Sequence, residues 1–316
     1  MKNNFKLHHL RDFVAIAQHR SVRAAARHLD VAQPSLTRSL RELERELGVP
    51  VMERHARGVT LTPSGERFLV RASNALNEIR RAGEEARQFA GEDIGSVSAA
   101  LSATPMLALA PYAVPRFHAA HPGVSLRIVE GTFPAAEARL LDGQLDLYAG
   151  AAPDKLSRKF HSRTLFNNQL VVMARKGHPL AEARRLRDLQ GAQWMQTGLR
   201  DGEVEAMFRA AGLEAPQCHT SIESVLGLLT VISQSDCLAA LPRQWTDIAM
   251  FRTALTPIAV RETLAGPPIV LITRAGIPLT PAAEQFATLL ERAAGPAYTP
   301  GKTRRSSTAR APDSPA

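Results

Sequence analysis

The chain has 316 residues with a formal net charge of +9, and 45% of its residues are hydrophobic. This length predicts two or three domains, and this composition predicts globular cores and excludes a largely disordered chain. No apolar run follows the charged first residues, so no secretory signal is expected. The uncharged stretch 95–115 contains prolines, which favours a strand followed by a helix over a membrane span. We therefore expect a cytoplasmic chain that has no membrane partner.

The positive charge is unevenly distributed along the chain. Residues 1–90 carry 16 Lys and Arg against 10 Asp and Glu, whereas residues 91–299 carry 19 of each. A basic first segment joined to a neutral body indicates that the first segment binds a polyanion.

Three short helical patterns open the chain. Apolar residues recur at helical spacing over 10–17 and again over 22–29, where Ser21 stands as an N-cap. The third pattern covers 33–47, with Pro34 in its first turn. Only three residues separate the second pattern from the third, which is the spacing of a helix–turn–helix.

The third helix is expected to have two unlike faces. Its leucines cluster on one side, whereas Arg38, Arg41 and Arg45 lie on the other. The leucines would hold the helix to a small core. The polar face would enter the major groove of DNA, where base edges and phosphates both lie. The alternative is that this face is only the solvated side of a bundle helix.

A strand–turn–strand pattern follows over 49–65, with its turn at 55–58. This two-stranded wing would carry arginines to phosphates or to the minor groove. Short polar side chains at the start of the third helix would contact bases, and arginines would contact phosphates or guanines. The candidate DNA-binding residues are Ser21, Arg23, Gln33, Pro34, Ser35, Thr37, Arg38, Arg41, Arg54 and Arg57.

A long helix is predicted next, with Thr62 as its N-cap and Pro63 at its first position. It could run to about Ala90, and its apolar residues form a long, narrow stripe. Such a stripe cannot bury itself, so it predicts a partner helix, most simply from a second copy of the chain. The alternative is that it packs on the protein's own body.

Short strands alternate with helices from about residue 96 onwards. This alternation predicts parallel sheets with crossover helices, and no GxGxxG or Walker motif accompanies it. The strand candidates are 96–102, 124–131, 145–150, 169–179, 193–198, 217–222, 237–242 and 266–276, and the helix candidates are 104–119, 134–142, 203–212, 223–235 and 280–295. The end of the chain is rich in Pro, Ser, Thr and Arg, which predicts disorder.

The first 65 residues resemble the LysR-type transcriptional regulators. The resemblance rests on a small-residue second helix, Gln-Pro at the start of the third, Leu-Glu near its end, Leu-Gly, and then an arginine and Leu-Thr-x-x-Gly through the wing. Thr37 stands where serine is commonest, and Val51-Met52 stands where Leu-Phe is usual. "LDGQLDLYAG" and "ESVLGLLTVISQSDCLAALP" extend the resemblance more weakly. "GTFP" and "TPAA" suggest the subgroup that regulates aromatic and sulfonate catabolism.

The resemblance implies a fold and an organisation. The fold class is α/β with a helix-rich head: a winged helix–turn–helix, a long linker helix and a two-lobed effector domain like the periplasmic binding proteins. The implied divisions are 1–62 for DNA binding, 63–92 for the linker helix that forms the dimer, 93–297 for effector binding and 298–316 for a disordered tail. The resemblance also implies a homotetramer.

An effector would bind where strands end and helices begin. Two α/β lobes leave a cleft at the carboxyl ends of their strands, and the helix N-termini there favour anions. In the resembled family the same loops line the effector pocket. The alternative is that each hydroxyl only caps its own helix. The candidate effector-binding residues are Ser102, Thr104, Thr132, Gln196, Thr197, Ser221 and Ser224.

No set of residues predicts catalysis, a metal site or a cofactor. His118 and His121 have a spacing that could bind a metal, but no third ligand is apparent. Cys218 and Cys237 form no zinc pattern; they could be a redox pair or two partly buried side chains.

The sequence therefore predicts a non-enzymatic regulator that binds double-stranded DNA and responds to a small, anionic effector. The alternative is a small-molecule-binding protein without specific DNA recognition. A nucleic-acid-modifying enzyme is a third possibility, for which no catalytic cluster is visible.

Overall fold

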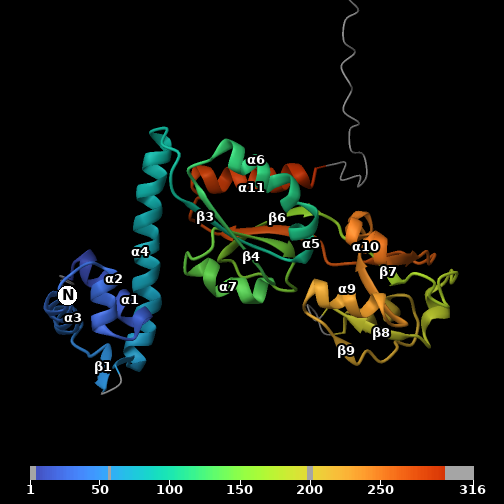
Figure 1. Ribbon diagram of the computed structural model, residues 1–316, viewed down its shortest axis with the longest axis horizontal. Helices are drawn as coiled ribbons and strands as arrows, with labels where there is room; N and C mark the ends of the chain where they lie inside the picture. Colours follow the sequence, from blue (N-terminus) through green and yellow to red (C-terminus); the bar gives the residue numbers. More distant parts are fainter. Residues whose placement is uncertain (1–4, 56–57, 198–201, 296–316) are drawn as a thin grey trace, which may run out of the picture. The chain divides into compact units, whose positions relative to one another are not determined.

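The computed structural model describes residues 5–55, 58–197 and 202–295 (Figure 1). The chain forms two compact units. The first unit holds residues 5–102, 112–164 and 270–289, and the second holds 103–111, 165–269 and 290–295. No described helix has the length and apolar character needed to cross a bilayer.

The first unit begins with a small domain that we call the head (residues 5–62), followed by a long helix. The elements are α1 (Leu7–His19), α2 (Val22–His28), α3 (Gln33–Leu47), the hairpin strands β1 (Met52–His55) and β2 (Gly58–Leu61), and α4 (Pro63–Phe89). Gly48 ends α3 in the left-handed conformation, and Thr62 caps α4 by accepting a hydrogen bond from the Gly65 amide. The helices agree with the sequence prediction. His55 and Gly58, which were predicted in the turn, are paired residues of the two strands.

The head has its own apolar core. Phe13, Ile16 and Leu43 are fully buried in it, together with residues from the other head helices and both hairpin strands. The first half of α4 closes this core through Phe68 and Ala72. The helix–turn–helix is therefore held rigidly by burial of apolar side chains.

The rest of the first unit is a sheet with helices on both faces, which we call the first α/β part. Its strands are β3 (Ser96–Leu101), β4 (Ser125–Glu130), β5 (Leu147–Ala151), β6 (Phe160–Phe166) and β13 (Ile269–Arg274), in the order β4-β3-β5-β13-β6. β3 runs parallel to β4 and β5. Figure 1 shows α6 (Ala110–Ala120) and α11 (Pro281–Ala293) on one face and α7 (Phe133–Leu141) on the other.

The second unit holds a sheet of mixed direction. Its strands are β7 (Gln169–Arg175), β8 (Gln193–Gln196), β9 (Thr220–Ser221), β10 (Cys237–Pro242), β11 (Leu255–Ile258) and β12 (Leu264–Ala265). The order is β11-β7-β10-β8-β9, with β12 also paired to β7. The helical elements are α5 (Ala103–Ala108), η1 (Leu186–Leu189), α8 (Glu203–Ala210), α9 (Val225–Ser233), η2 (Arg243–Asp247) and α10 (Ala249–Ala254).

Several sequence predictions for these sheets were wrong. The second sheet is not parallel throughout, because β7 runs antiparallel to β10, β11 and β12. The helix predicted over 104–119 is two helices that break at Leu109, with Pro111 in the first turn of the second. Consequently Thr104 does not cap a helix, since α5 begins one residue earlier. The predicted disordered tail lies outside the described residues.

Candidate nucleic-acid interface

The two faces of α3 differ as the sequence predicts. Leu36, Leu40 and Leu43 are at most 3% exposed, whereas the residues on the opposite face are solvent-exposed. The exposed side chains of α3 in its first three turns are Gln33, Pro34, Ser35, Arg38 and Arg41, with Thr37 half-buried among them. No acidic side chain occurs in the first turn of α3. This face offers hydrogen-bond donors and positive charge along one side of a rigid helix.

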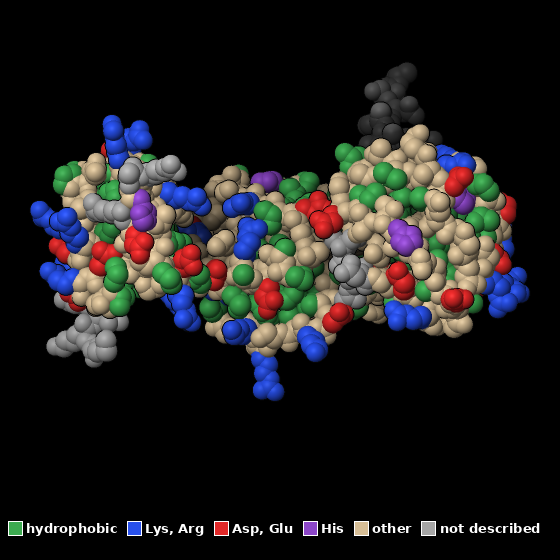
Figure 2. All heavy atoms as spheres, turned by 90° about the horizontal axis from the view of Figure 1, so that it is seen from below, with side chains coloured by type: hydrophobic (Ala, Val, Ile, Leu, Met, Phe, Trp, Pro, Cys, Tyr) green, Lys and Arg blue, Asp and Glu red, His purple; other side chains and the backbone are tan. Residues whose placement is uncertain are grey.

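The exposed face is also hollowed. A concave surface with a volume of about 530 Å³ is lined by Gln33, Pro34, Thr37, Arg38 and Arg41. These five predicted residues are therefore brought together on one surface. Figure 2 shows Lys and Arg side chains (blue) standing out from the head at the left of the view. A surface that presents guanidinium groups beside short polar side chains can donate to both phosphates and base edges.

The other predicted DNA-binding residues are less closely grouped. Arg23 is exposed on α2. The Ser21 hydroxyl accepts a hydrogen bond from the Ala24 amide at 3.3 Å, so it caps α2. Arg54 lies in β1, but its side chain is not described, and Arg57 lies outside the described residues.

Three hydrogen bonds position the hairpin, one to a backbone carbonyl and two to a side chain, and none of them was predicted. The Val59 amide donates to the carbonyl oxygen of Arg20 at 3.1 Å. Gly58 has φ +133°, and a Cβ there would lie 2.6 Å from the same oxygen. The Glu44 carboxylate of α3 accepts from the amides of Val51 and Met52. The glycine in the predicted turn and the Leu-Glu pair in α3 were the available signals.

The predicted effector residues of the first unit lie at one edge of its sheet. Ser102 follows β3 and Thr132 follows β4, and the last residues of these neighbouring parallel strands are paired in register. Ser102 is 5% exposed. Thr132 precedes α7 without a capping hydrogen bond from its side chain. Its hydroxyl is therefore not used as a helix cap.

The second unit contains a similar group. Gln196 and Ser221 are register partners at the ends of the parallel strands β8 and β9, and Thr197 is buried. The Gln196 Oε1 atom is buried without a hydrogen-bond partner among the described residues. Ser224 accepts from the Gly227 amide and so caps α9. Thr104 is buried in α5.

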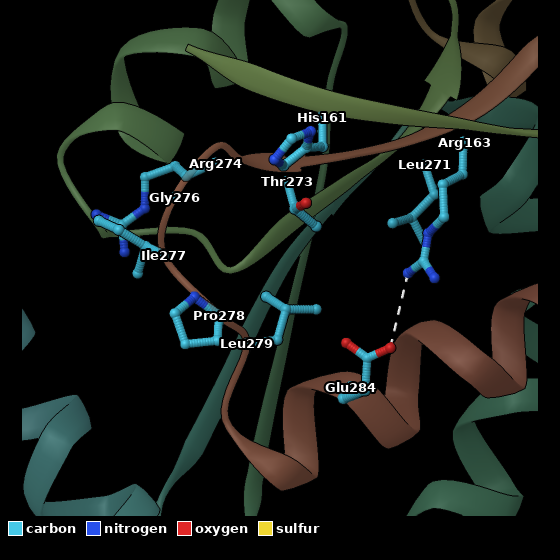
Figure 3. Close-up of a pocket in the computed structure, with 10 residues that line it drawn as sticks. All are labelled: His161, Arg163, Leu271, Thr273, Arg274, Gly276, Ile277, Pro278, Leu279 and Glu284. Carbon is cyan, nitrogen blue, oxygen red and sulfur yellow. Dashed lines mark ion pairs between the residues drawn. The ribbon is translucent and has the colours of Figure 1, made fainter.

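A further hollow lies in the first α/β part, beside β6, a strand that the sequence analysis did not predict. Its volume is about 360 Å³, and Figure 3 shows it lined by residues of β6, β13, the segment after β13 and α11. Arg163 and Glu284 form an ion pair at 3.8 Å. The Arg274 guanidinium is paired with Glu78 of α4. The charged groups of this hollow are therefore already paired with one another or with α4.

The structure does not favour reactivity at Cys218, and it gives His121 hydrogen-bond partners within the chain. Burial raises the pKa of the Cys218 thiol, which disfavours the reactive thiolate. Both cysteines are free. His121 is hydrogen-bonded to Asp93 and Gln285. In the described part of the chain, no group of three or more His, Cys, Asp or Glu is placed to hold a metal ion.

Comparison with known proteins gives two family matches that together span most of the chain. Residues 7–66 match the bacterial regulatory helix-turn-helix protein, lysR family, and residues 90–295 match the LysR substrate binding domain. The SDS degradation transcriptional activation protein of Pseudomonas sp. (strain ATCC 19151) is 30% identical over 293 residues, covering 90% of this chain and 95% of that protein. The HTH-type transcriptional regulator GbpR of Azospirillum brasilense is 28% identical over 290 residues, covering 90% and 85%.

Solved structures show the same fold. CbnR, a LysR family transcriptional regulator, has a TM-score of 0.66 at 23% identity, covering 92% of this chain and 99% of that chain. Full-length CbnR complexed with its target DNA has a TM-score of 0.68 at 23% identity, covering 91% and 99%.

Proposed function

The chain belongs to the LysR family of transcriptional regulators, and from that premise we propose which of its residues contact DNA and effector. It has a DNA-binding helix–turn–helix and a substrate-binding α/β domain. The division into head, linker helix 63–92 and effector domain 93–297 is part of this proposal. The protein would act in the cytoplasm, where its DNA is.

α3 enters the major groove of its operator. The observation that carries this proposal is the hollowed, exposed face of α3 opposite a buried leucine face. Gln33, Ser35 and Thr37 contact base edges near the helix N-terminus, and Arg38 and Arg41 contact phosphates or guanines. Arg23 and the wing residues Arg54 and Arg57 add phosphate contacts. The DNA complex of CbnR, a protein of the same fold, supports this use of the head.

Fluorescence anisotropy with the intergenic DNA beside its own gene tests the function. Tight binding that survives an excess of unrelated duplex, and that weakens steeply as salt rises, is expected for a specific regulator. Binding that any duplex competes away equally would contradict specific recognition of this DNA. The chain would then be tested as a small-molecule-binding protein by thermal shift.

We propose that a small anionic effector is held by the polar residues at the strand ends of the two units. The proposed effector contacts of the first unit are Ser102 and Thr132, and those of the second unit are Thr104, Gln196, Thr197, Ser221 and Ser224. The unpaired Oε1 of Gln196 supports a polar ligand near β8. One relative is named for the degradation of SDS, an anionic alkyl sulfate, which supports an anionic effector. Placing this chain with the regulators of aromatic and sulfonate catabolism stays a proposal that rests on "GTFP" and "TPAA" alone.

A thermal-shift screen of small carboxylates and sulfonates tests the effector residues. A compound that raises the unfolding temperature of the wild-type chain should lose most of that effect in Thr132→Val. The matched control is Thr246→Val, a hydroxyl in η2 that only bonds the local carbonyl of Arg243. Equal shifts in both variants would remove Thr132 from the site.

We also propose that α4 pairs with α4 of a second copy through its second half. The head covers the apolar stripe only as far as Leu76. Beyond that residue Ile79 is 51% exposed and Phe89 is 76% exposed, with small residues between them. An exposed apolar stripe of this kind on a helix favours a helical partner. A tetramer built from two such dimers completes the proposal.

A further inference from the structure

α4 is bonded to the two parts of the first unit by different kinds of contact. Its first half enters the apolar core of the head through Phe68, Ala72 and Leu76. From Asn74 onwards, α4 contacts the first α/β part through polar side chains. These are Asn74, Asn77, Glu78, Arg81 and Gln88, which recur at helical spacing and so lie along one side of α4.

Arg81 is the most deeply buried of these side chains. Its side chain is 10% exposed. Its Nη2 lies 2.9 Å from Asp146 Oδ1 and donates to the carbonyl oxygen of Gly143 at 2.8 Å. A planar guanidinium that bonds a carboxylate and a carbonyl together fixes both the position and the rotation of the helix that carries it.

Asp146 is in turn bonded to the strand next to it. Its Oδ2 accepts from the Ser98 amide, and its own amide donates to the Ser98 carbonyl oxygen, each at 2.7 Å. Asp146 immediately precedes β5, and Ser98 lies in β3. Arg81 is therefore connected to β3 through one carboxylate.

Neighbouring contacts point the same way. Glu78, one turn before Arg81, pairs with the buried Arg274 of β13 at 2.5 Å, and Figure 3 shows Arg274 beside the hollow of the first α/β part. Asn77 donates to the carbonyl oxygen of Asp142 at 3.2 Å. Gln88 accepts from the Ala282 amide at the start of α11. α4 is thus bonded to three places around the sheet, with Arg81 in the middle.

We propose that Arg81 is the positioning residue that sets the orientation of α4, and with it the head, on the first α/β part. A buried ion pair contributes little net stability compared with apolar packing, but it specifies one geometry. β3 passes from Ser98, bonded to Asp146, to Leu101, just before Ser102. Because Ser102 is a proposed effector contact, a shift of β3 on effector binding would reach α4 through Asp146 and Arg81. This last step rests on the proposed function.

Burial also acts on the charges of this pair. It lowers the pKa of Arg81, although the Asp146 carboxylate opposes that change. It raises the pKa of Asp146 despite Arg81 and the hydrogen bond from Ser98. Both directions mean that the pair lies in a poorly hydrated place, where an unpaired charge is costly.

The test measures the distance between head and sheet in the full-length chain, without DNA or effector. Spin labels are placed at Gln18→Cys on α1 and Ala138→Cys on α7, both exposed, with Cys218 and Cys237 replaced by serine. Labelled chains are diluted with unlabelled chains so that distances within one chain are measured. Pulsed electron paramagnetic resonance then gives the distance distribution.

Arg81→Met with Asp146→Leu removes the pair without leaving a buried lone charge. We expect its distance distribution to be at least twofold wider than that of the wild type. Arg81→Lys should give an intermediate width, because a lysine keeps the charge but carries it on a flexible ammonium instead of a rigid planar group. The matched control is Arg87→Met with Glu92→Leu, which removes an exposed ion pair near the end of α4 and should leave the distribution unchanged.

A wild-type width in the Arg81→Met/Asp146→Leu chain, or an equal broadening in the control, would overturn the proposal. If the double variant fails to fold, Arg81→Lys decides the question by the same measurement. The unfolding temperature of each variant is measured as well, because a purely structural role would lower it without widening the distribution in the folded state. Since no DNA is present, failure here would leave the proposed regulator function untouched.

Discussion

The two sides of α4 differ in the kind of bonding they use. On the head side, Phe68 contacts the rings of Phe5 and Phe13, and Ala72 is buried. On the side of the first α/β part, α4 is held by hydrogen bonds and ion pairs, and no α4 residue belongs to the apolar cluster that contains Phe133 and Tyr148. Apolar burial is strong and non-directional, whereas hydrogen bonds and ion pairs are directional and exchange readily with water.

We call the contacts of Phe68, Ala72 and Leu76 with the head core the apolar joint. The hydrogen bonds and ion pairs between α4 and the first α/β part are the polar joint. The apolar joint makes the head and the first half of α4 into one rigid body. The polar joint defines an angle, because its hydrogen bonds and its buried Arg81–Asp146 pair are directional. A regulator needs both properties, because a DNA-binding surface must be rigid while its placement must respond to a ligand.

The largest expected effect comes from breaking the apolar joint. Phe13→Ala should cost about 3–5 kcal/mol, because it removes a fully buried ring from the head core. The head should unfold at a lower temperature and DNA binding should be lost, while the unfolding of the α/β units is retained in calorimetry. Phe89→Ala, which truncates an exposed ring on the same unit, is the control and should leave the head's transition in place. An unchanged unfolding temperature of the head in Phe13→Ala would refute the apolar joint.

Breaking the polar joint from one side should cost slightly less. Arg81→Met leaves Asp146 buried without its cation, which typically costs about 3 kcal/mol or more. Adding Asp146→Leu should recover most of that loss in the unfolding free energy. If the single and double variants are equally destabilised, the pair contributes packing rather than charge.

Arg38→Ala tests the surface that the apolar joint supports. Its side chain is exposed, so the unfolding temperature should not change. DNA affinity should fall by about 1–3 kcal/mol if Arg38 contacts a guanine, and the salt slope should fall by about 1 if it contacts a phosphate. Arg187→Ala, an exposed arginine of the second unit, provides the matched control. Unchanged affinity would remove Arg38 from the interface.

Ile79→Glu tests the exposed apolar stripe in the second half of α4. A carboxylate in a helix–helix contact should weaken self-association by about tenfold, equivalent to roughly 1.4 kcal/mol. Sedimentation velocity would follow the shift towards smaller species. Val70→Glu, at another exposed apolar position of α4, is the comparison. Equal effects at both positions would show that the stripe has no special role.

The smallest expected effect is a change of the unfolding temperature with pH. Burial raises the folded-state pKa of Asp146. The stability that this group contributes is therefore complete below its unfolded pKa of about 3.9, and it is lost as pH rises through the folded value. The unfolding temperature of the wild type relative to Arg81→Met/Asp146→Leu should accordingly decrease from about pH 4 towards neutrality. An increase over that interval would contradict the raised pKa.

The sequence predicted the head better than the remainder of the chain. The spacing of leucines in α3 and the caps at Ser21 and Thr62 are local signals, and local signals determine where helices begin and which face is buried. The helix bounds agree closely as a result. The site residues remain proposals, although five of them line one hollow.

The α/β units were harder to predict because strand direction leaves no trace in the side-chain pattern. β7 reads as an apolar run in either direction, yet it pairs antiparallel with β10. β6 was missed because residues 161–164 are all exposed, so no alternation marks them. The Arg81–Asp146 pair joins residues that are 65 positions apart in the sequence, and no local pattern around either residue predicts the contact.

The core of the head ends at Leu76, and the polar contacts to the sheet begin at Asn74. A chimera joined just after Leu76 would therefore transfer the core of the head to another sensor of this family. The new sensor would then supply its own residues in place of Arg81 and Asp146, and its success would depend on whether those residues bond the helix to the sheet. Residues 74–88 act in this sense as an adaptor, which is the segment to redesign when building a biosensor from this chain.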